Sequence, residues 1–304
     1  TGLCNDLSLC TMEIYNVVQW IVDGYKAGYL NDTKTGLEID KLGTWNFFET
    51  LCNMITYRKG FGEILAEGLI RAGETLGEEA KAIFANEVSG VGDGATYSAR
   101  EYLVNGLLYA FEPRQPIAML HEVSRTMGMW VMNLKYPGST PVTADTYRAA
   151  ASIFWGHEKA WDLNTHEGKA MAATRTIDRT HAKDSLGLCD SCWPLMFSHH
   201  TENKVGDITL ESRTFNAVTG QDLDEPALRH FGERIFNQQR AILLREGWDP
   251  KTDDDVAEFN YTDPVQSVFM NPEVLMPGEG DAVLSRKGKT LDRDVFKKMR
   301  TEFY

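Results

Sequence analysis

The apolar residues of this chain recur with the period of an α-helix over much of its length. In residues 12–29 the apolar side chains fall three or four positions apart, and the same spacing returns in residues 41–57 and 226–247. Alternation of apolar and polar residues, which is typical of a half-buried strand, is rare. The sequence therefore predicts a mainly α fold.

Further helices are expected in residues 63–76, 78–86, 117–131, 167–182 and 291–304, and Thr143 is expected to cap another. Residues 87–105 contain several glycines and are expected to form a loop, followed by a buried stretch. A length of 304 residues suits about two domains. We expect the boundary within residues 88–106.

Composition excludes several classes of protein. The formal net charge is −13, and an acidic surface repels phosphate backbones, so no nucleic-acid partner is expected. Apolar runs such as residues 17–22 are far shorter than the ~20 residues of a membrane span. No cationic, apolar leader opens the chain. The five cysteines are odd in number and irregularly spaced, so they do not form a disulfide framework, and a cytoplasmic location is expected.

Two six-residue segments resemble each other. Residues 5–10 read NDLSLC and residues 184–189 read DSLGLC. The initial Asn or Asp can accept hydrogen bonds from an amine-bearing heterocycle, and the Ser or Gly at the fourth position lets the backbone approach a ligand. The final thiolate is a soft ligand suited to iron–sulfur clusters and heavy metals. On the residues alone, two helix–loop junctions with buried cysteines are the more conservative interpretation.

The segment DSLGLC resembles the pterin-and-cluster motif of the aldehyde:ferredoxin oxidoreductase family of tungsten enzymes. Four more segments resemble that family in the same order along the chain: GFGEILAEG at residues 60–68, FEPR at 111–114, GERIFNQQRAILLREG at 232–247 and DDD at 253–255. Together they extend over nearly the whole sequence.

The resemblance implies the multihelical C-terminal domains of that family. Residues 1–100 would be part of domain 2, with the first pterin motif, and residues 101–304 would be domain 3, with the second motif and the cluster cysteine. The implied cofactors are a tungsten bis-pterin and a [4Fe–4S] cluster. The residues implied to contact the two pterins are Asn5, Asp6 and Leu9 in the first motif and Asp184, Gly187 and Leu188 in the second.

Cys189 would then ligate the cluster, whose other three cysteines are expected in an N-terminal part of the polypeptide that this sequence does not include. One cysteine cannot hold a cluster alone. That N-terminal part and an iron–sulfur electron-transfer subunit are the implied partners. The proton donor is also expected in the N-terminal part.

Cys10 departs from the pattern of the family's aldehyde oxidases, which carry Asp at this position. A thiolate there can bind tungsten directly, because soft ligands suit a sulfur-rich site. These oxidases also place a histidine shortly after the segment that resembles residues 124–128, whereas the next histidine here is His157. Both departures resemble the tungsten subunit of class II benzoyl-coenzyme A reductases. The alternative for Cys10 is a buried packing residue.

The reaction implied is the two-electron reduction of the aromatic ring of benzoyl-CoA, or of a related aromatic acyl-CoA, to a cyclic dienoyl-CoA in anaerobic aromatic degradation. Cys10 would be its catalytic residue. The alternative within the family is a tungsten enzyme that oxidises aldehydes to carboxylic acids. An alternative of another class is a non-catalytic helical partner of an iron–sulfur enzyme.

Weaker candidates are Cys192, which completes a Cys-x2-Cys spacing with Cys189, the pairs His121–Glu122 and His199–His200, and the arginines Arg234, Arg240 and Arg245. The cysteine pair would suit zinc or redox chemistry, but no second such pair exists in the sequence. His121–Glu122 could face a cavity, but a buried structural role is expected. His199–His200 could be a metal or proton-relay pair, but a surface position is expected. The arginines would bind phosphates or pair with surface carboxylates. Cys4 is expected in the core.

Overall fold

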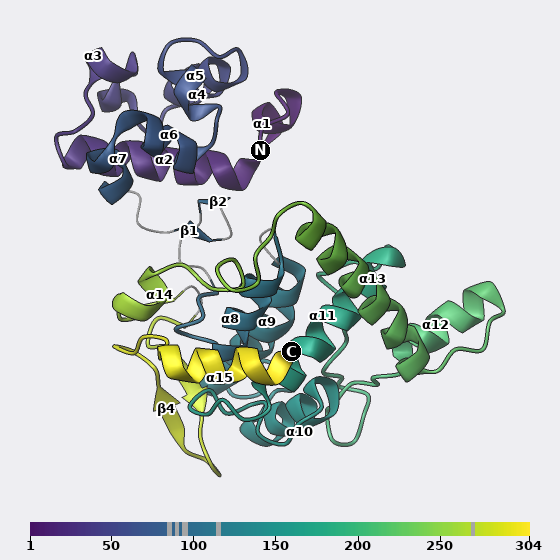
Figure 1. The fold of residues 1–304 in the computed structure, drawn as a ribbon. Helices are drawn as coiled ribbons and strands as arrows, with labels where there is room; N and C mark the ends of the chain where they lie inside the picture. Colours follow the sequence, from purple (N-terminus) through teal and green to yellow (C-terminus); the bar gives the residue numbers. More distant parts are fainter. Residues whose placement is uncertain (84–86, 89–90, 93–96, 114–116, 269–270) are drawn as a thin grey trace. The chain divides into compact units, whose positions relative to one another are not determined.

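The computed structural model describes residues 1–83, 87–88, 91–92, 97–113, 117–268 and 271–304 (Figure 1). Within these ranges the chain forms fifteen α-helices and four short strands, which confirms the predicted mainly α fold. Contacts divide the chain into two compact units, Thr1–Ala95 and Thr96–Tyr304. None of the described helices is long and apolar enough to cross a membrane.

The first unit is a cluster of short helices around α2. Its elements are α1 (Gly2–Asp6), α2 (Thr11–Lys26), α3 (Asp32–Thr35), a 3-10 turn (Ile39–Lys41), α4 (Trp45–Thr56), α5 (Phe61–Leu65), α6 (Leu69–Leu76), α7 (Glu78–Ile83) and the paired strands β1 (Glu87–Val88) and β2 (Val91–Gly92). The apolar face of α2, including Ile14, Val17 and Ile21, belongs to the same buried cluster as Leu51 and Ile55 of α4.

The helix predicted over residues 63–76 is wrong as a single element, because the chain forms α5 and α6 with a break at Gly68. Gly68 has a φ of 86°, which an L side chain rarely adopts. Gly62 allows α5 to lie directly against α4, since a Cβ at this position would be 2.2 Å from the carbonyl oxygen of Met54. In this segment, GFGEILAEG, Gly62 therefore has a packing role, whereas Gly60 and Gly68 provide positive φ angles.

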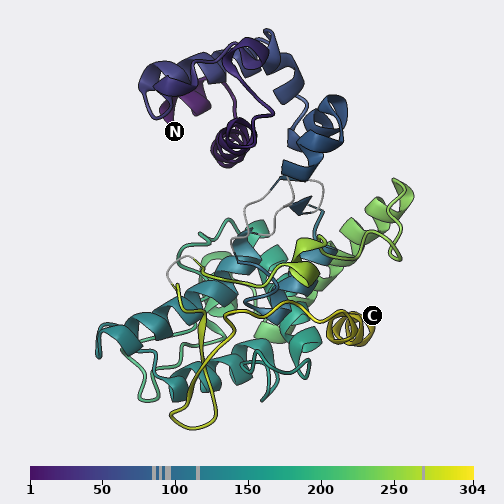
Figure 2. The ribbon, with the colours of Figure 1, turned by 90° about the vertical axis from the view of Figure 1, so that its left-hand side faces the viewer.

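The second unit is built around α11 (Lys169–Ser185). The other elements are α8 (Leu103–Phe111), α9 (Ile117–Lys135), α10 (Ala144–Trp155), α12 (Leu210–Thr219), α13 (Glu225–Arg245), α14 (Phe259–Thr262), α15 (Arg293–Phe303) and the antiparallel hairpin of β3 (Leu275–Pro277) and β4 (Val283–Ser285). Helix α11 contacts α8, α9, α10, α13 and α15 (Figure 1 and Figure 2). The contact with α13 is close at Gly232, where a Cβ would lie 1.7 Å from the carbonyl oxygen of Asp178.

Three predictions about local structure are decided in this unit. Thr143 caps α10 as predicted, and its hydroxyl accepts a hydrogen bond from the Thr146 N–H at 3.1 Å. The loop predicted over residues 87–105 is wrong where β1 pairs with β2 and at its end, where α8 begins at Leu103. Residues 89–90 and 93–96 of this prediction lie outside the described residues. Helix α11 continues to Ser185, beyond the predicted end at residue 182, so the DSLGLC segment begins inside the helix.

Candidate functional site

The two similar segments adopt the same local fold, one in each unit. Helix α1 ends at Asp6 and α11 ends at Ser185, which are the second residues of NDLSLC and DSLGLC. The fourth residue of each segment has a left-handed backbone, with φ of 56° at Ser8 and 66° at Gly187. Only glycine takes this conformation at little cost, so Ser8 is strained where Gly187 is not.

Matching hydrogen bonds hold both turns. The N–H of the fourth residue donates to the carbonyl of the first, and the N–H of the fifth donates to the carbonyl just before the segment. The distances are 3.2 and 2.8 Å after α1, and 3.1 and 3.1 Å after α11. This is the Schellman cap of a helix C-terminus. The same cap ends α13 at Gly247, so the turn alone is not specific for a ligand.

The residues of the two segments are mostly accessible in this chain. Exposed members are Asn5, Asp6, Cys10, Asp184, Gly187 and Cys189, and half-buried members are Leu9 and Leu188. The interpretation of Cys10 and Cys189 as buried packing residues is therefore wrong. Cys4 lies in the core, as predicted, and it belongs to α1.

Cys10 is the residue at which α2 begins. Its carbonyl accepts the first helical hydrogen bond, from the Ile14 N–H at 3.0 Å. The N-terminal end of a helix favours a negative charge, which a metal-binding thiolate carries. Leu9 and Cys10 also line a cavity of about 410 Å³ between α2 and the α5–α6 region. Glu13 lies in the same wall, and burial raises the pKa of its carboxyl.

Asp190 anchors the loop that follows Cys189. Its carboxylate lies 2.6 Å from Nδ1 of His121 and 3.2 Å from Nζ of Lys183. Its carbonyl accepts a hydrogen bond from Arg125 at 2.6 Å. Lys183 is only 1% exposed, so its charge is balanced within the chain by this carboxylate. Two helices, α9 and α11, therefore fix the position of the Cys189 backbone.

The thiol of Cys189 has hydrogen-bond donors around it. The backbone N–H of Ser191 is the largest contribution that lowers its pKa, with further hydrogen bonds from Cys192 and the Ser191 hydroxyl. A lowered pKa favours the thiolate that a metal requires. Among the described residues no three His, Cys, Asp or Glu side chains lie close enough to hold a metal ion. The Cys-x2-Cys pair therefore has no third zinc ligand in that part of the chain.

The paired histidine candidates serve different roles. Glu122 is fully buried and forms an ion pair with Arg179 at 2.8 Å, which confirms a buried structural role for this residue. His121 is 24% exposed and belongs to the Asp190 anchor. His199 and His200 are exposed on the surface, as predicted.

Arg240 is a structural residue of the second unit. It pairs with a carboxylate, but the prediction of a surface carboxylate is wrong for this residue, because Asp254 is buried. It pairs with the buried carboxylate of Asp254 at 2.6 Å, and Trp248 donates to the same carboxylate at 2.7 Å. The backbone carbonyl of Asp254 accepts from Arg300 of α15 at 2.8 Å. The middle residue of the DDD segment thus connects α13 to α15. Arg234 and Arg245 are exposed.

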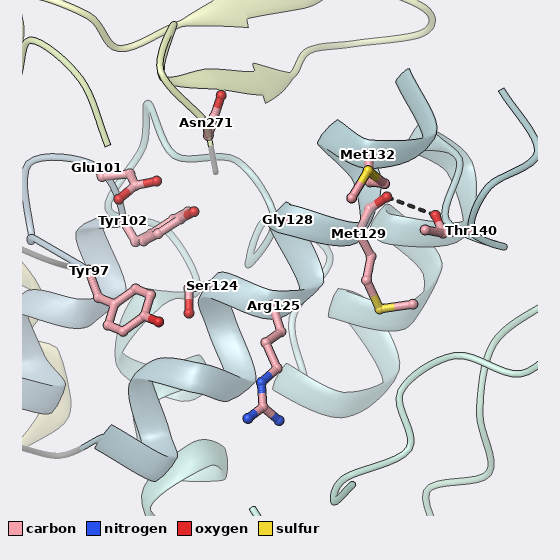
Figure 3. Close-up of a pocket in the computed structure, with 10 residues that line it drawn as sticks. All are labelled: Tyr97, Glu101, Tyr102, Ser124, Arg125, Gly128, Met129, Met132, Thr140 and Asn271. Atoms are coloured by element: carbon pink, nitrogen blue, oxygen red, sulfur yellow. Dashed lines mark hydrogen bonds between the residues drawn. The ribbon is translucent and has the colours of Figure 1, made fainter. Parts of the chain in front are cut away.

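A cavity of about 220 Å³ is lined in part by residues of α9 (Figure 3). Its lining residues are Tyr97, Glu101, Tyr102, Ser124, Arg125, Gly128, Met129, Met132, Thr140 and Asn271. Arg125 belongs to this wall and also donates to the Asp190 carbonyl. Tyr97, in the same wall, makes an edge-to-face contact with His121 at 5.5 Å between ring centroids.

Glu101 is the perturbed group of this cavity. It is 3% exposed, and desolvation raises its pKa to about 8 in spite of a hydrogen bond from Tyr102. Burial also raises the pKa of Tyr102 well above its usual range. Sequence reasoning missed both residues, and it missed Asp190 as an anchor. The adjacent residues Glu101 and Tyr102 match no motif that would indicate a site. Asp190 lies between Cys189 and Cys192, so its position in the Cys-x2-Cys segment could have indicated a role.

A helical chain with two matching capped turns, each of which exposes one cysteine, has the features of a cofactor-binding pair of helical domains. The family described as aldehyde ferredoxin oxidoreductase, domains 2 & 3, matches residues 1–304, and the chain belongs to this family. It is also similar to the tungsten-containing aldehyde ferredoxin oxidoreductase of Pyrococcus furiosus, with 23% identity over 264 residues. That match covers 86% of this chain and 37% of the relative, so the chain spans little more than a third of the relative's length.

Proposed function

We propose that this chain forms the second and third domains of a tungsten bis-pterin oxidoreductase. Its family membership and the printed name of its relative support this class. The single structural observation that carries the proposal is the matched pair of capped turns, each ending in an exposed cysteine.

The proposed cofactor contacts follow the two segments. Asn5, Asp6 and Leu9 would contact one pterin, and Asp184, Gly187 and Leu188 the other. Cys10 would ligate tungsten and Cys189 would ligate a [4Fe–4S] cluster. When bound, the tungsten bis-pterin would supply two-electron redox chemistry.

The donor set fits these roles. Both cysteines are exposed. Cys10 is the N-cap residue of α2, and the backbone N–H groups of Ser191 and Cys192 lower the pKa of the Cys189 thiol. Because the described residues contain no cluster of three candidate ligands, the other cluster ligands would come from another part of the protein. An N-terminal part of the polypeptide and an iron–sulfur electron-transfer subunit are the proposed partners. The five free cysteines suit a reducing, cytoplasmic setting.

For the reaction, we propose reduction of the aromatic ring of benzoyl-CoA, or of a related aromatic acyl-CoA, by two electrons and two protons to a cyclic dienoyl-CoA. Cys10 carries this choice, because a thiolate at this position occupies a metal site that an oxygen ligand would otherwise fill. Leu9 and Ile14 give the adjoining cavity an apolar wall. Exclusion of water from such a site suppresses the competing reduction of protons.

The second candidate is oxidation of aldehydes to carboxylic acids. The relative's printed name favours it. In that case Cys10 would lie beside the metal without a bond to it, and an oxygen ligand would take part in the chemistry.

The cluster assignment is tested by Cys189→Ser in the full-length protein. We expect lower iron content and weaker visible absorption of the cluster. Cys192→Ser is the matched control, since it changes a neighbouring exposed cysteine and should leave the iron content unchanged. Equal iron content in the wild type and Cys189→Ser would refute the assignment.

The tungsten assignment is tested by X-ray absorption on the wild type and Cys10→Asp. We expect one sulfur fewer around tungsten in the variant, together with loss of benzoyl-CoA reduction. An identical sulfur shell in both proteins would refute the bond from Cys10. Rapid oxidation of simple aldehydes by the wild type, without reduction of benzoyl-CoA, would establish the second candidate.

A further inference from the structure

We propose that the cavity beside α9 binds a small aromatic carbonyl compound, whose carbonyl oxygen accepts a hydrogen bond from the carboxylic acid of Glu101. The cavity lies within the second unit, and binding to it requires neither metal nor pterin. This inference therefore stands or fails separately from the proposed redox function.

The size and lining of the cavity select a single ring. Its volume is about 220 Å³, and an apolar protein cavity of roughly 150 Å³ is large enough for benzene. The thioether side chains of Met129 and Met132 and the rings of Tyr97 and Tyr102 are among the groups that line it (Figure 3). Sulfur atoms and aromatic edges both make favourable contacts with an aromatic ring.

The polar groups of the wall leave few donors for a ligand. The Ser124 hydroxyl donates to the Leu120 carbonyl at 2.6 Å, and the Thr140 hydroxyl donates to the Met129 carbonyl at 2.8 Å. Both protons are therefore committed within the chain. The buried Glu101 carboxyl is protonated at neutral pH, so it offers an O–H donor rather than a negative charge.

The charged groups around the cavity favour a neutral ligand. The guanidinium of Arg125 lies in the wall, but it is paired with the Asp190 carboxylate at 3.6 Å. Glu101 adds no negative charge at neutral pH, because its buried carboxyl is protonated. A neutral ligand with a polarised carbonyl oxygen matches the O–H donor of this acid.

Glu101 has neighbours from each element around it. Tyr97 and Tyr102 precede α8, Arg125 lies on α9, and Tyr147 of α10 interacts with Tyr102. Burial raises the pKa of Tyr97, Tyr102 and Tyr147 above their ordinary value near 10. Binding that depends on the Glu101 proton should therefore weaken as pH rises through about 8.

The test measures acetophenone binding to the full-length protein by calorimetry, with cumene as a ligand of similar shape that lacks the carbonyl. We expect acetophenone to bind more tightly than cumene at pH 7. Its Kd should rise at least tenfold between pH 7 and pH 9.5, because only the protonated acid can donate. In Glu101→Gln, whose amide also donates but does not titrate in this range, the Kd should stay constant over the same interval.

A second variant locates the binding site independently of Glu101. A Cβ at Gly128 would meet no atom within 4 Å, so the side chain of Gly128→Leu has space to enter the cavity from α9. We expect this variant to lose at least tenfold in acetophenone affinity. Unchanged affinity in Gly128→Leu, equal binding of cumene, a Kd in the wild type that does not depend on pH, or no binding of acetophenone would each overturn the inference.

Discussion

Replacement of Asp190 by Asn should destabilise the second unit, because it removes the charge that balances a buried lysine. The Lys183 ammonium is 1% exposed and lies 3.2 Å from the Asp190 carboxylate. Its other described partner is the Trp193 carbonyl, at 3.3 Å. In Asp190→Asn the amide oxygen can still accept a hydrogen bond, but the lysine charge is no longer neutralised.

The expected loss in the free energy of unfolding follows from the burial of Lys183 and of Asp190. Removal of one partner from a fully buried ion pair costs about 3–5 kcal/mol. The Asp190 side chain is 28% exposed, so water screens part of the effect. We therefore expect a decrease of about 2–3 kcal/mol in the free energy of unfolding, close to the upper range for a hydrogen bond to a charged group.

The assay is urea unfolding of Asp190→Asn, Lys183→Met and the double variant. Because Lys183→Met removes the buried charge, the effect of Asp190→Asn should be smaller in that background, with a coupling free energy of at least about 1 kcal/mol. Asp145→Asn is the matched control. Its carboxylate pairs with Arg148 at 2.7 Å but is 92% exposed, so its loss should cost less than about 1 kcal/mol.

Two results would refute this reasoning. The first is a loss in Asp190→Asn no larger than that in Asp145→Asn. The second is additivity in the double variant, which would mean that the lysine does not depend on this carboxylate. If the anchor also positions Cys189, the Asp190→Asn protein in full-length form should lose iron to a chelator faster than the wild type.

Two further predictions concern the capped turns and the buried acid. Gly187→Ala should lower the free energy of unfolding by about 1 kcal/mol, whereas Ser8→Gly should raise it by a similar amount, because both positions have positive φ. Urea unfolding measures both changes. A change of the same sign in the two variants would contradict the argument from backbone strain. Burial raises the pKa of Glu101 from 4.5 to about 8, so the folded state binds this proton more tightly than the unfolded chain and stability should fall as pH rises through this interval. This pKa shift limits the change in the free energy of unfolding to about 5 kcal/mol. Glu101→Gln should be more stable than the wild type at pH 9 but not at pH 4. The same dependence of stability on pH in the two proteins would exclude the pKa shift.

Several features of the fold follow from local sequence. The 3.6-residue period predicts α2, α4 and α13, because each of these helices buries one face and exposes the other. Thr143 is recognised as a cap from its residue type and its position before a helix. The two turns are visible as a repeated pattern of six residues. Their proposed roles toward pterins and metals stay predictions.

Tertiary structure decided what periodicity could not reveal. Every residue of α8 is buried, so the helix presents no polar face to solvent, and its first turn was expected to be loop. The chain breaks into α5 and α6 at Gly68 where the sequence predicted one helix. For α8, burial of the whole helix in its unit set the outcome, whereas the break at Gly68 follows from the positive φ of that glycine.

The Glu101 cavity and the Asp190 anchor also depend on contacts between residues that are far apart in the sequence. Asp190 meets a histidine 69 residues earlier in the chain, and the wall of the Glu101 cavity combines residues from position 97 to position 271. Composition and local pattern determined a mainly α chain with two similar turns, because helix periodicity and cap chemistry act over a few residues. Only the packing of helices that are distant in sequence placed the Glu101 carboxyl in the wall of a cavity and the Asp190 carboxylate beside the buried Lys183. Desolvation and charge pairing depend on neighbours in space, which the local sequence does not specify.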